Sequence, residues 1–340
     1  MKTSDKHLSL VVDLYGCPNR CRHCWLGHMP NRRMEEGADE WIFQYFEPFF
    51  ENITFYSWLR EPDFCENYRE RWERDRHLSR GIAPRRFELG SFWRIVRDRQ
   101  YVKFLKEVGV QKLQLTFFGL ERYTDEYVGR KGAFRELLQT TEILIENEIA
   151  PRWQAFINEE NKEEVAGLLS LIEERGLYER CAAFGSNFSF FVHAGSCDGE
   201  NRKLYGIRIN KQDIPRELIP YFPNYDEQKP EGEWCRQLKE EKGCVIYHNE
   251  EDIVLNISNT YDVFFNFTHM TPNWKIGNLK RDDRNELIRR VLEEDILALN
   301  LAKNITLGEL VGRYGDFCSD KVFSLEDYKS YLLNCYVDGQ

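Results

Sequence analysis

The chain has 340 residues, 42% hydrophobic and 31% charged, which is enough for one large domain or for one domain with a smaller second one. A formal net charge of −10 argues against general binding to nucleic acid, whose phosphates attract basic surfaces. No apolar run approaches the ~20 residues that span a membrane. The first seven residues also lack the apolar stretch of a signal peptide, so we expect a cytoplasmic protein without membrane contact.

Short β-branched or aromatic segments alternate with amphipathic or charged segments through the first 195 residues. Strands are predicted at residues 8–14, 53–58, 87–89, 111–118, 152–157 and 181–192. Helices are predicted at residues 38–50, 66–80, 98–107, 133–148 and 161–175. This alternation predicts βαβ units and a parallel sheet. Six such units are too few for a closed eight-stranded barrel, which takes ~250 residues.

The alternation stops after residue 196, and there we expect the boundary between a core domain, 1–196, and a C-terminal extension, 197–340. A polar segment rich in Pro and Gly predicts a linker near the start of this extension. Two strand-like runs separated by a turn predict a β-hairpin, and helices follow. The expected linker is 223–233, the strands are 253–257 and 263–267, and the helices are 281–303 and 325–335.

Three cysteines follow the first predicted strand in one polar loop. Cys17, Cys21 and Cys24 have the spacing C-x3-C-x2-C, and the aromatic Trp25 comes next. Thiolates at this spacing can converge on one soft metal centre from a single loop. A closed [4Fe–4S] cluster takes four cysteines, so three leave one iron free to bind a substrate or cosubstrate. Ten cysteines in a cytosolic chain also favour metal or redox use over disulfides.

A structural zinc site is the alternative interpretation of the same loop. Such a site takes four ligands, commonly from two C-x2-4-C pairs, and the chain has no second pair. His23 or His28 could complete the set. The corresponding alternative function is that of a non-catalytic protein, with an iron–sulfur or a zinc centre, whose extension binds a partner.

The cysteine motif at the end of a first strand resembles the signature of the radical SAM family, which uses S-adenosylmethionine (SAM). The resemblance covers about residues 8–195. It implies an α/β fold, an open (β/α)6 partial TIM barrel, in which Cys17, Cys21 and Cys24 hold a [4Fe–4S] cluster and SAM binds the fourth iron. One electron, from a flavodoxin- or ferredoxin-type donor, would cleave SAM to a 5′-deoxyadenosyl radical, which takes a hydrogen atom from a substrate C–H bond.

The resemblance also implies which residues bind SAM. Glu61 stands where the family has a Gly-Gly-Glu motif that contacts the SAM amino group, although the two glycines are absent here. Ser91 lies in a small polar segment after the third strand, and Arg130 would pair with the SAM carboxylate, a bidentate task that suits a guanidinium group. The alternative interpretation of Glu61 is a Glu in a surface turn. Candidates for binding the ribose hydroxyls are Gln154 and Asn158, and local hydrogen bonds could instead satisfy each of these side chains.

The segment from Trp274 to Leu279 resembles part of a degenerate SPASM- or twitch-type extension. In such domains a hairpin supplies a cysteine to an auxiliary cluster, but Asn266 or Thr268 stands at that place, so we expect the hairpin to serve as a lid over the barrel mouth. Cys197 follows the sixth strand and Cys235 begins the extension. Some radical SAM epimerases use such a thiol as a hydrogen-atom donor, and packing is the alternative.

Together these expectations describe an enzyme that tailors a small polar natural product, such as a sugar, or a peptide. The net reaction stays open between epimerisation or rearrangement, dehydrogenation, and bond formation. Seven arginines between residues 69 and 86 predict a solvated, ion-paired helix or, alternatively, a docking surface for an anionic substrate, a leader peptide or the electron donor.

Overall fold

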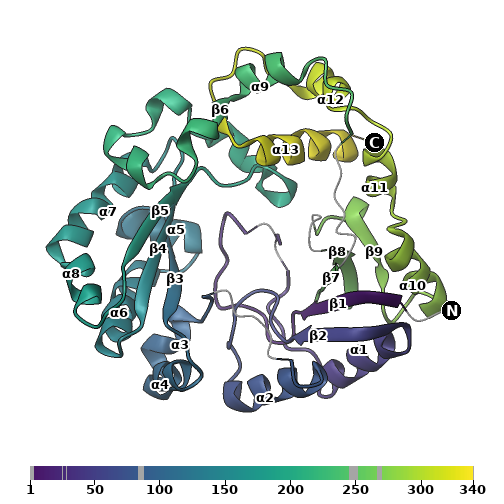
Figure 1. Ribbon diagram of the computed structural model, residues 1–340, viewed down its shortest axis with the longest axis horizontal. Coiled ribbons are helices and arrows are strands. Elements are labelled where there is room, and N and C mark those ends of the chain that lie inside the picture. Colours follow the sequence, from purple (N-terminus) through teal and green to yellow (C-terminus); the bar gives the residue numbers. More distant parts are fainter. Residues whose placement is uncertain are drawn as a thin grey trace.

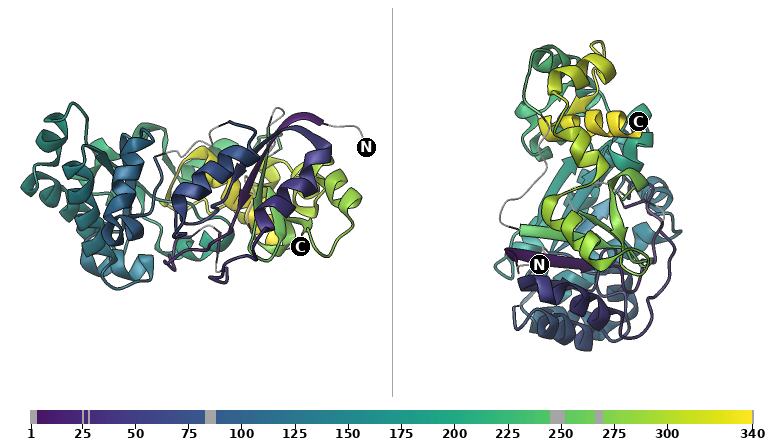
Figure 2. Two further views of the ribbon diagram at one scale, coloured as in Figure 1. Left: turned by 90° about the horizontal axis from the view of Figure 1, so that it is seen from below. Right: turned by 90° about the vertical axis from the view of Figure 1, so that its right-hand side faces the viewer.

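The protein is a mixed α/β structure whose parallel strands lie in two sheets. The computed structural model describes residues 4–24, 26–27, 29–82, 88–244, 252–265 and 270–339. In one sheet β1 (Ser4–Val12) pairs in parallel with β2 (Phe50–Tyr56). In the other, β3 (Lys112–Phe117), β4 (Ala150–Phe156) and β5 (Ser189–His193) are parallel neighbours. The two sheets lie at opposite ends of the long axis, with loops between them (Figures 1 and 2).

Helices connect the parallel strands, as the periodicity predicted. In α1, for example, Ile42 and Phe46 are fully buried, because apolar residues four apart share one helix face. The arginine-rich α2 is tied to α1, where Arg71 lies 2.8 Å from Asp39. Arg85 and Arg86 lie outside the described residues. The helix bounds are α1 (Ala38–Phe46), α2 (Tyr68–Leu78), α3 (Phe92–Arg97), α4 (Arg99–Glu107), α5 (Glu121–Val128), α6 (Ala133–Glu146), α7 (Lys162–Glu174) and α8 (Leu177–Ala182).

The predicted third strand is wrong in its described part. Glu88 forms a turn and Leu89 has no regular structure, whereas Phe87 lies outside the described residues. The backbone of Glu88 has a φ of 60°, which is left-handed and unsuited to a strand. Its carbonyl still accepts a hydrogen bond from the backbone N–H of Gln114 in β3, at 2.8 Å. The segment therefore lies beside β3 without forming a ladder.

The predicted sixth strand is shorter than expected. Residues 181–182 belong to α8, and only Ser189–His193 form β5. Among the described residues, five parallel strands therefore precede residue 196, and they are divided between two sheets. The α/β class with parallel strands is confirmed, but a continuous six-stranded partial barrel is not.

The hairpin of the extension joins the first sheet. β7 (Asp252–Ile257) pairs in parallel with β1, placing Asn256 opposite Val11. β8 (Asp262–Phe265) and β9 (Lys275–Asn278) continue the sheet in antiparallel order, giving β2-β1-β7-β8-β9. The expectation of a lid is therefore wrong, because the hairpin extends the sheet. Asn266 and Thr268 lie outside the described residues.

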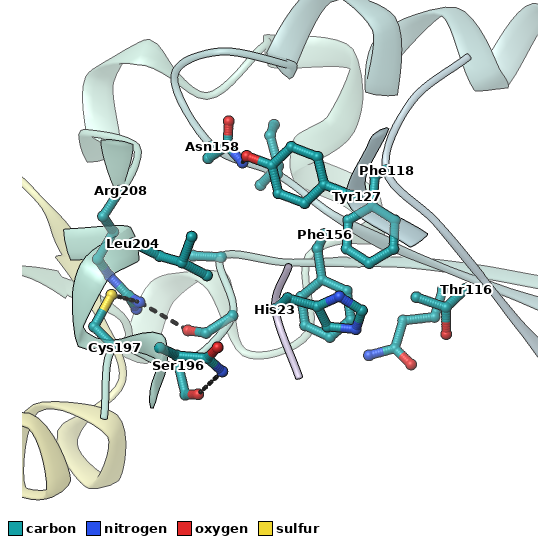
Figure 3. Close-up of a pocket in the computed structure, with 15 residues that line it drawn as sticks. His23, Thr116, Phe118, Tyr127, Phe156, Asn158, Ser196, Cys197, Leu204 and Arg208 are labelled. Carbon is teal, nitrogen blue, oxygen red and sulfur yellow. Dashed lines mark hydrogen bonds between the residues drawn. The ribbon is translucent and has the colours of Figure 1, made fainter. Parts of the chain in front are cut away.

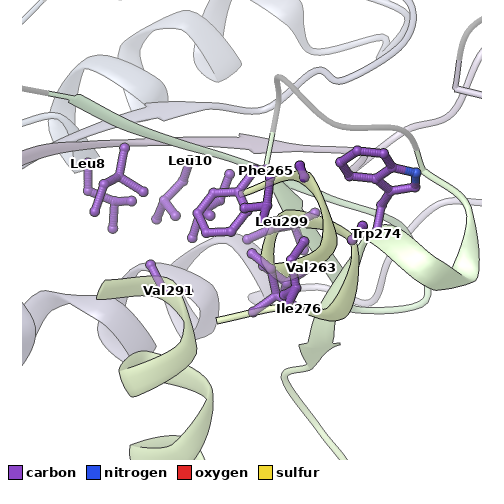
Figure 4. Close-up of a cluster of buried hydrophobic side chains, with 14 of the residues drawn as sticks. Leu8, Leu10, Val263, Phe265, Trp274, Ile276, Val291 and Leu299 are labelled. Atoms are coloured by element: carbon purple, nitrogen blue, oxygen red, sulfur yellow. The ribbon is translucent and has the colours of Figure 1, made fainter. Parts of the chain in front are cut away.

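One hydrophobic core joins the start of the chain to the extension (Figure 4). Leu8 and Leu10 of β1 belong to the same buried cluster as Phe265 of β8. Val291 and Leu299, on the helices α10 (Arg284–Glu293) and α11 (Leu297–Ala302), complete it. Burying each such side chain stabilises the fold by about 1.5–3 kcal/mol. The boundary at residue 196 stays a prediction, since the two parts share this core.

The expected linker at 223–233 is wrong, because much of it is regular structure. The polar composition predicted an exposed segment, but Glu231 is fully buried. Its carboxylate accepts hydrogen bonds from the Tyr205 hydroxyl at 2.5 Å and from the Asp316 N–H at 3.2 Å.

None of the described helices is long and apolar enough to cross a membrane. The remaining elements are η1 (Glu47–Phe49), η2 (Gly199–Ile207), η3 (Lys211–Asp213), η4 (Arg216–Tyr221), η5 (Tyr225–Glu227), β6 (Lys229–Pro230), α9 (Glu231–Leu238), η6 (Pro272–Trp274), α12 (Leu307–Tyr314), β10 (Val322–Phe323) and α13 (Leu325–Asp338).

Candidate functional site

A cavity of about 570 Å³ lies where the cysteine loop passes the carboxyl ends of the strands. Val11 of β1, Thr116 of β3 and Asn256 of β7 line it, each near the end of a parallel strand. Ligands of open parallel sheets bind at this edge. The cavity is also lined by Cys17, Cys21, Cys24, Arg60, Glu61, Gly90 and Phe92.

The three cysteines are free, half-buried and on one cavity wall. Burial, followed by the neighbouring Cys24, raises the pKa of Cys21 to about 12. Among the described residues no three His, Cys, Asp or Glu side chains are placed to hold a single metal ion. Iron–sulfur clusters are held by cysteine thiolates, and in a cubane each thiolate binds a different iron, so the ligands need not meet at one point. The donor set therefore fits a [4Fe–4S] cluster.

The cysteine loop is docked on the end of α5. The backbone N–H groups of Arg20 and Arg22 donate to the carbonyls of Val128 and Tyr127, at 3.0 and 2.7 Å. Gly129 follows with a φ of 69°, and a Cβ there would lie 2.5 Å from the Arg20 carbonyl oxygen. Only glycine fits this close approach.

Arg60, which stands where the resemblance would place a glycine, ties the end of β1 to the end of the cysteine loop. Its Nε and Nη2 donate to the two carboxylate oxygens of Asp13, at 3.1 and 2.7 Å. The same side chain donates to the carbonyls of Met29 and Pro30, at 3.3 and 3.0 Å. Asp13 is only 1% exposed, and its burial raises its pKa although Arg60 opposes the shift. The departure from Gly-Gly-Glu was the only signal of this contact in the sequence.

Glu61 and Ser91 lie together beside the first cysteine, as their assignment to one site requires. The Ser91 hydroxyl donates to Glu61 Oε1 at 2.6 Å, and Glu61 Oε2 lies 4.0 Å from Cys17 Sγ. Burial raises the pKa of Glu61 to about 7, while the Ser91 hydrogen bond and the charge of Arg130 oppose the shift. A buried carboxylate in this position is suited to accept a hydrogen bond from an ammonium group.

Arg130 lies next to the cysteine loop, but much of its side chain already has partners. Its Nε donates to Asn19 Oδ1 at 2.9 Å, and its Nη1 lies 2.7 Å from Glu136 Oε2. Its Nη2 is buried without a hydrogen-bond partner in the described part of the chain. One nitrogen therefore remains for a ligand.

A second cavity of about 290 Å³ adjoins the first (Figure 3). His23, Thr116 and Phe118 line both cavities. The His23 ring centroid lies 4.3 Å from that of Phe118 and 5.1 Å from that of Phe156. Burial lowers the pKa of His23 to about 4, so the ring is neutral at pH 7, and its Nδ1 has no hydrogen-bond partner among the described residues.

The two residues predicted to bind ribose both line this second cavity. Gln154 Oε1 accepts a hydrogen bond from Gln114 Nε2 at 2.5 Å. Asn158 donates to the Tyr127 hydroxyl at 2.7 Å and accepts from the backbone N–H of Glu160 at 2.9 Å. The structure thus brings both side chains to the cavity, and it also shows that Asn158 is satisfied locally.

The two candidate thiols have different surroundings. Cys197 lines the second cavity and accepts a hydrogen bond from Arg208 Nη1 at 3.3 Å (Figure 3). Cys235 is buried in the core 2.9 Å from the Tyr328 hydroxyl, and it is not among the residues lining either cavity. Cys235 is therefore packed in the core away from both cavities, whereas Cys197, although only 1% exposed, is among the residues that line the second cavity.

Comparison with known proteins finds a likeness in the fold. No family model and no curated protein matches the chain. A structure of anSMEcpe with bound AdoMet and Kp18Cys peptide matches 98% of this chain and 99% of that one, with 14% identity and a TM-score of 0.50. A histidine-tagged anSMEcpe with bound AdoMet matches 98% and 96%, with 12% identity and a TM-score of 0.50. Streptococcus suis SuiB bound to precursor peptide SuiA matches 96% and 76%, with 12% identity and a TM-score of 0.45.

The shared coverage and the TM-scores of 0.50 identify the class of fold. The chain has an α/β fold shared with proteins whose solved structures contain bound AdoMet, which is SAM. Within that class, the fold shared over nearly the whole of both chains is that of anSMEcpe. The resemblance that the cysteine motif indicated is therefore found again in the arrangement of the strands and helices.

Proposed function

We propose that the protein is a radical SAM enzyme that holds a [4Fe–4S] cluster on Cys17, Cys21 and Cys24. One observation carries the proposal. The three free cysteines and the buried Glu61 carboxylate line one cavity at the carboxyl ends of parallel strands. When bound, the cluster would supply the electron that cleaves SAM to methionine and a 5′-deoxyadenosyl radical, and this radical would take a hydrogen atom from a substrate C–H bond.

SAM would extend through both cavities, with its methionyl end beside the cysteines. There Glu61 accepts a hydrogen bond from the SAM amino group, held in place by Ser91, and Arg130 offers its free Nη2 to the carboxylate. The ribose lies in the second cavity near Gln154 and Asn158. The rings that line this cavity exclude water from the reacting atoms.

A peptide is the substrate class that we favour over a small polar natural product such as a sugar. The support is that anSMEcpe, which shares the fold, has been solved with a bound Kp18Cys peptide. The reaction would be an epimerisation if Cys197 donates the second hydrogen atom, and a dehydrogenation or bond formation otherwise. A flavodoxin- or ferredoxin-type protein in the cytoplasm would deliver the electron.

An anaerobic preparation tests this proposal. We expect about four irons per chain, absorbance near 400 nm, and release of 5′-deoxyadenosine after addition of SAM and a reductant. Replacing Cys17, Cys21 and Cys24 together with Ala should abolish all three. The matched control replaces three cysteines that line neither cavity, Cys244, Cys318 and Cys335.

Two outcomes would contradict the proposal. Retention of iron by the first triple variant would show that these cysteines are not the ligands. A colourless protein with one zinc per chain would establish the non-catalytic, partner-binding alternative. Once cleavage of SAM is established, a comparison by mass of cell extracts incubated with and without the reduced enzyme would identify the substrate.

A further inference from the structure

Asn256 lines the cavity that contains the three cysteines, and its side chain holds a buried hydrogen-bond donor that has no partner in the described part of the chain. The residue is 2% exposed, and its Nδ2 has no hydrogen-bond partner among the described residues. Its position follows from the register of β7, which places it opposite Val11 of β1, and both residues line the cavity. A buried donor without a partner is destabilising, so such a group commonly meets a water or a ligand.

Two buried arginines near this cavity are largely occupied. Arg60 is engaged by Asp13 and by the carbonyls of Met29 and Pro30. Arg130 shares its charge with Glu136, and only its Nη2 is without a partner among the described residues. A carboxylate entering this cavity would therefore need a further donor, and the Asn256 amide supplies one.

We propose that Asn256 Nδ2 donates a hydrogen bond to the carboxylate of bound SAM. The inference rests on the proposed function, because SAM places its methionyl carboxylate beside the cysteines. It also gives the extension a role in the site. β7 does not merely complete the sheet beside β1; it contributes a SAM-binding residue that lies far from the cysteine motif in the sequence.

The extension offers a matched control residue for Asn256. Asn334 of α13 is fully buried, and neither its Nδ2 nor its Oδ1 has a hydrogen-bond partner among the described residues. It is not among the residues that line either cavity. Replacing it therefore removes the same kind of buried, unpaired amide without touching the site.

The test uses the full chain with its reconstituted cluster. Asn256→Ala, Asn256→Asp and Asn334→Ala are compared with the wild type for iron content, for the midpoint of thermal unfolding, and for the Kd of SAM by equilibrium dialysis. We expect Asn256→Ala to weaken SAM binding about tenfold or more, because a hydrogen bond to a charged group is lost. Asn256→Asp has nearly the same shape and should weaken binding further, since it places a second carboxylate beside the first.

The outcomes separate this inference from the proposed function. Unchanged SAM affinity in both Asn256 variants, with wild-type binding intact, would show that the amide meets only water. Equal weakening by Asn334→Ala would show a general effect of buried amides, and either result overturns the inference. A wild-type protein that holds the cluster but binds no SAM overturns the proposed function, and the inference falls with it.

Discussion

Asn259 Nδ2 donates a hydrogen bond to the carbonyl oxygen of Pro30, at 2.6 Å. In return, Arg32 Nη2 donates to the Asn259 carbonyl at 3.2 Å. The contacts join the turn after β7 to the end of the cysteine loop, and Arg60 reaches the same Pro30 carbonyl from the other side. The position of the loop therefore depends on a part of the chain that lies more than 200 residues further on.

Removing this contact should loosen the cysteine loop. We expect Asn259→Ala to lower the free energy of unfolding by about 0.5–1.5 kcal/mol, the usual net contribution of one hydrogen bond, since the Pro30 carbonyl keeps its hydrogen bond from Arg60. The cluster should be lost to a chelator several-fold faster, followed as the decay of absorbance near 400 nm. The control is Asn273→Ala, whose amide donates to the Val337 carbonyl away from the loop. Equal decay in the two variants would show that the turn does not support the loop.

The pair of Asp13 and Arg60 should be costly to break. Arg60→Ala leaves the buried Asp13 carboxylate without its partner, and such losses destabilise proteins by about 3–5 kcal/mol. Arg69→Ala is the comparison, because its ion pair with Glu107 is exposed and should be worth at most about 1 kcal/mol. Urea unfolding of the two variants measures the difference. A similar small loss in both would mean that Asp13 is not desolvated.

Glu61 and Arg130 are expected to hold opposite charges of SAM. Removing one partner of a desolvated charge pair costs about 2–5 kcal/mol, so Glu61→Gln and Arg130→Ala should each weaken SAM binding at least tenfold. Iron content should stay as in the wild type. Arg135→Ala, which removes an exposed partner of Glu121, is the control. Wild-type affinity in the two site variants would place both residues outside the SAM site.

Cys197 and Cys235 make a matched pair for testing the hydrogen donor. If the reaction is an epimerisation, Cys197→Ala should still cleave SAM and abstract hydrogen but should form no product. Cys235→Ala should behave as the wild type, because that thiol contacts Tyr328 in the core. In D2O the wild-type product should gain one deuterium from the exchangeable thiol. Normal product without solvent deuterium in both variants would assign the reaction to dehydrogenation or bond formation.

His193 should make stability depend on pH. Burial lowers its pKa, and the charge of Arg152 lowers it further. The unfolded chain therefore takes up a proton at a higher pH than the folded protein does, so the stability from neutral His193 is lost as the pH falls below about 6.5. The free energy of unfolding should fall less between pH 7 and pH 5 in His193→Gln than in the wild type. Parallel curves would show that His193 does not titrate differently on folding.

Local patterns predicted much of the fold but not its long-range pairing. The alternation of Leu113, Leu115 and Phe117 identified β3, because one face of that strand is buried against helices. The strand predicted at Glu88 was wrong, since its left-handed turn and its ion pair with Arg152 are not visible in the local sequence.

The same holds for the candidate site: local motifs predicted some of its residues, and long-range strand pairing placed others. The cysteines, Glu61 and Ser91 were found through the motif and its expected strand ends. Asn256 was missed because its place depends on β7 pairing with β1, and local composition does not encode which distant strands become neighbours. Arg208, which donates a hydrogen bond to Cys197, was not predicted either, because it is a single arginine after β5.

The pairing of β1 with both β2 and β7 also has a consequence for how the protein is made. β1 is synthesised before both of its partners, and the edge that pairs with β7 stays open until residues 252–257 have been synthesised. Long-range parallel pairing of this kind is slow, and an open strand edge invites aggregation. During this time the loop that carries the three cysteines would also lack its contacts with the turn after β7. Iron loading should therefore follow synthesis of the extension, and a nascent chain stalled before β7 should be both cluster-free and dependent on chaperones.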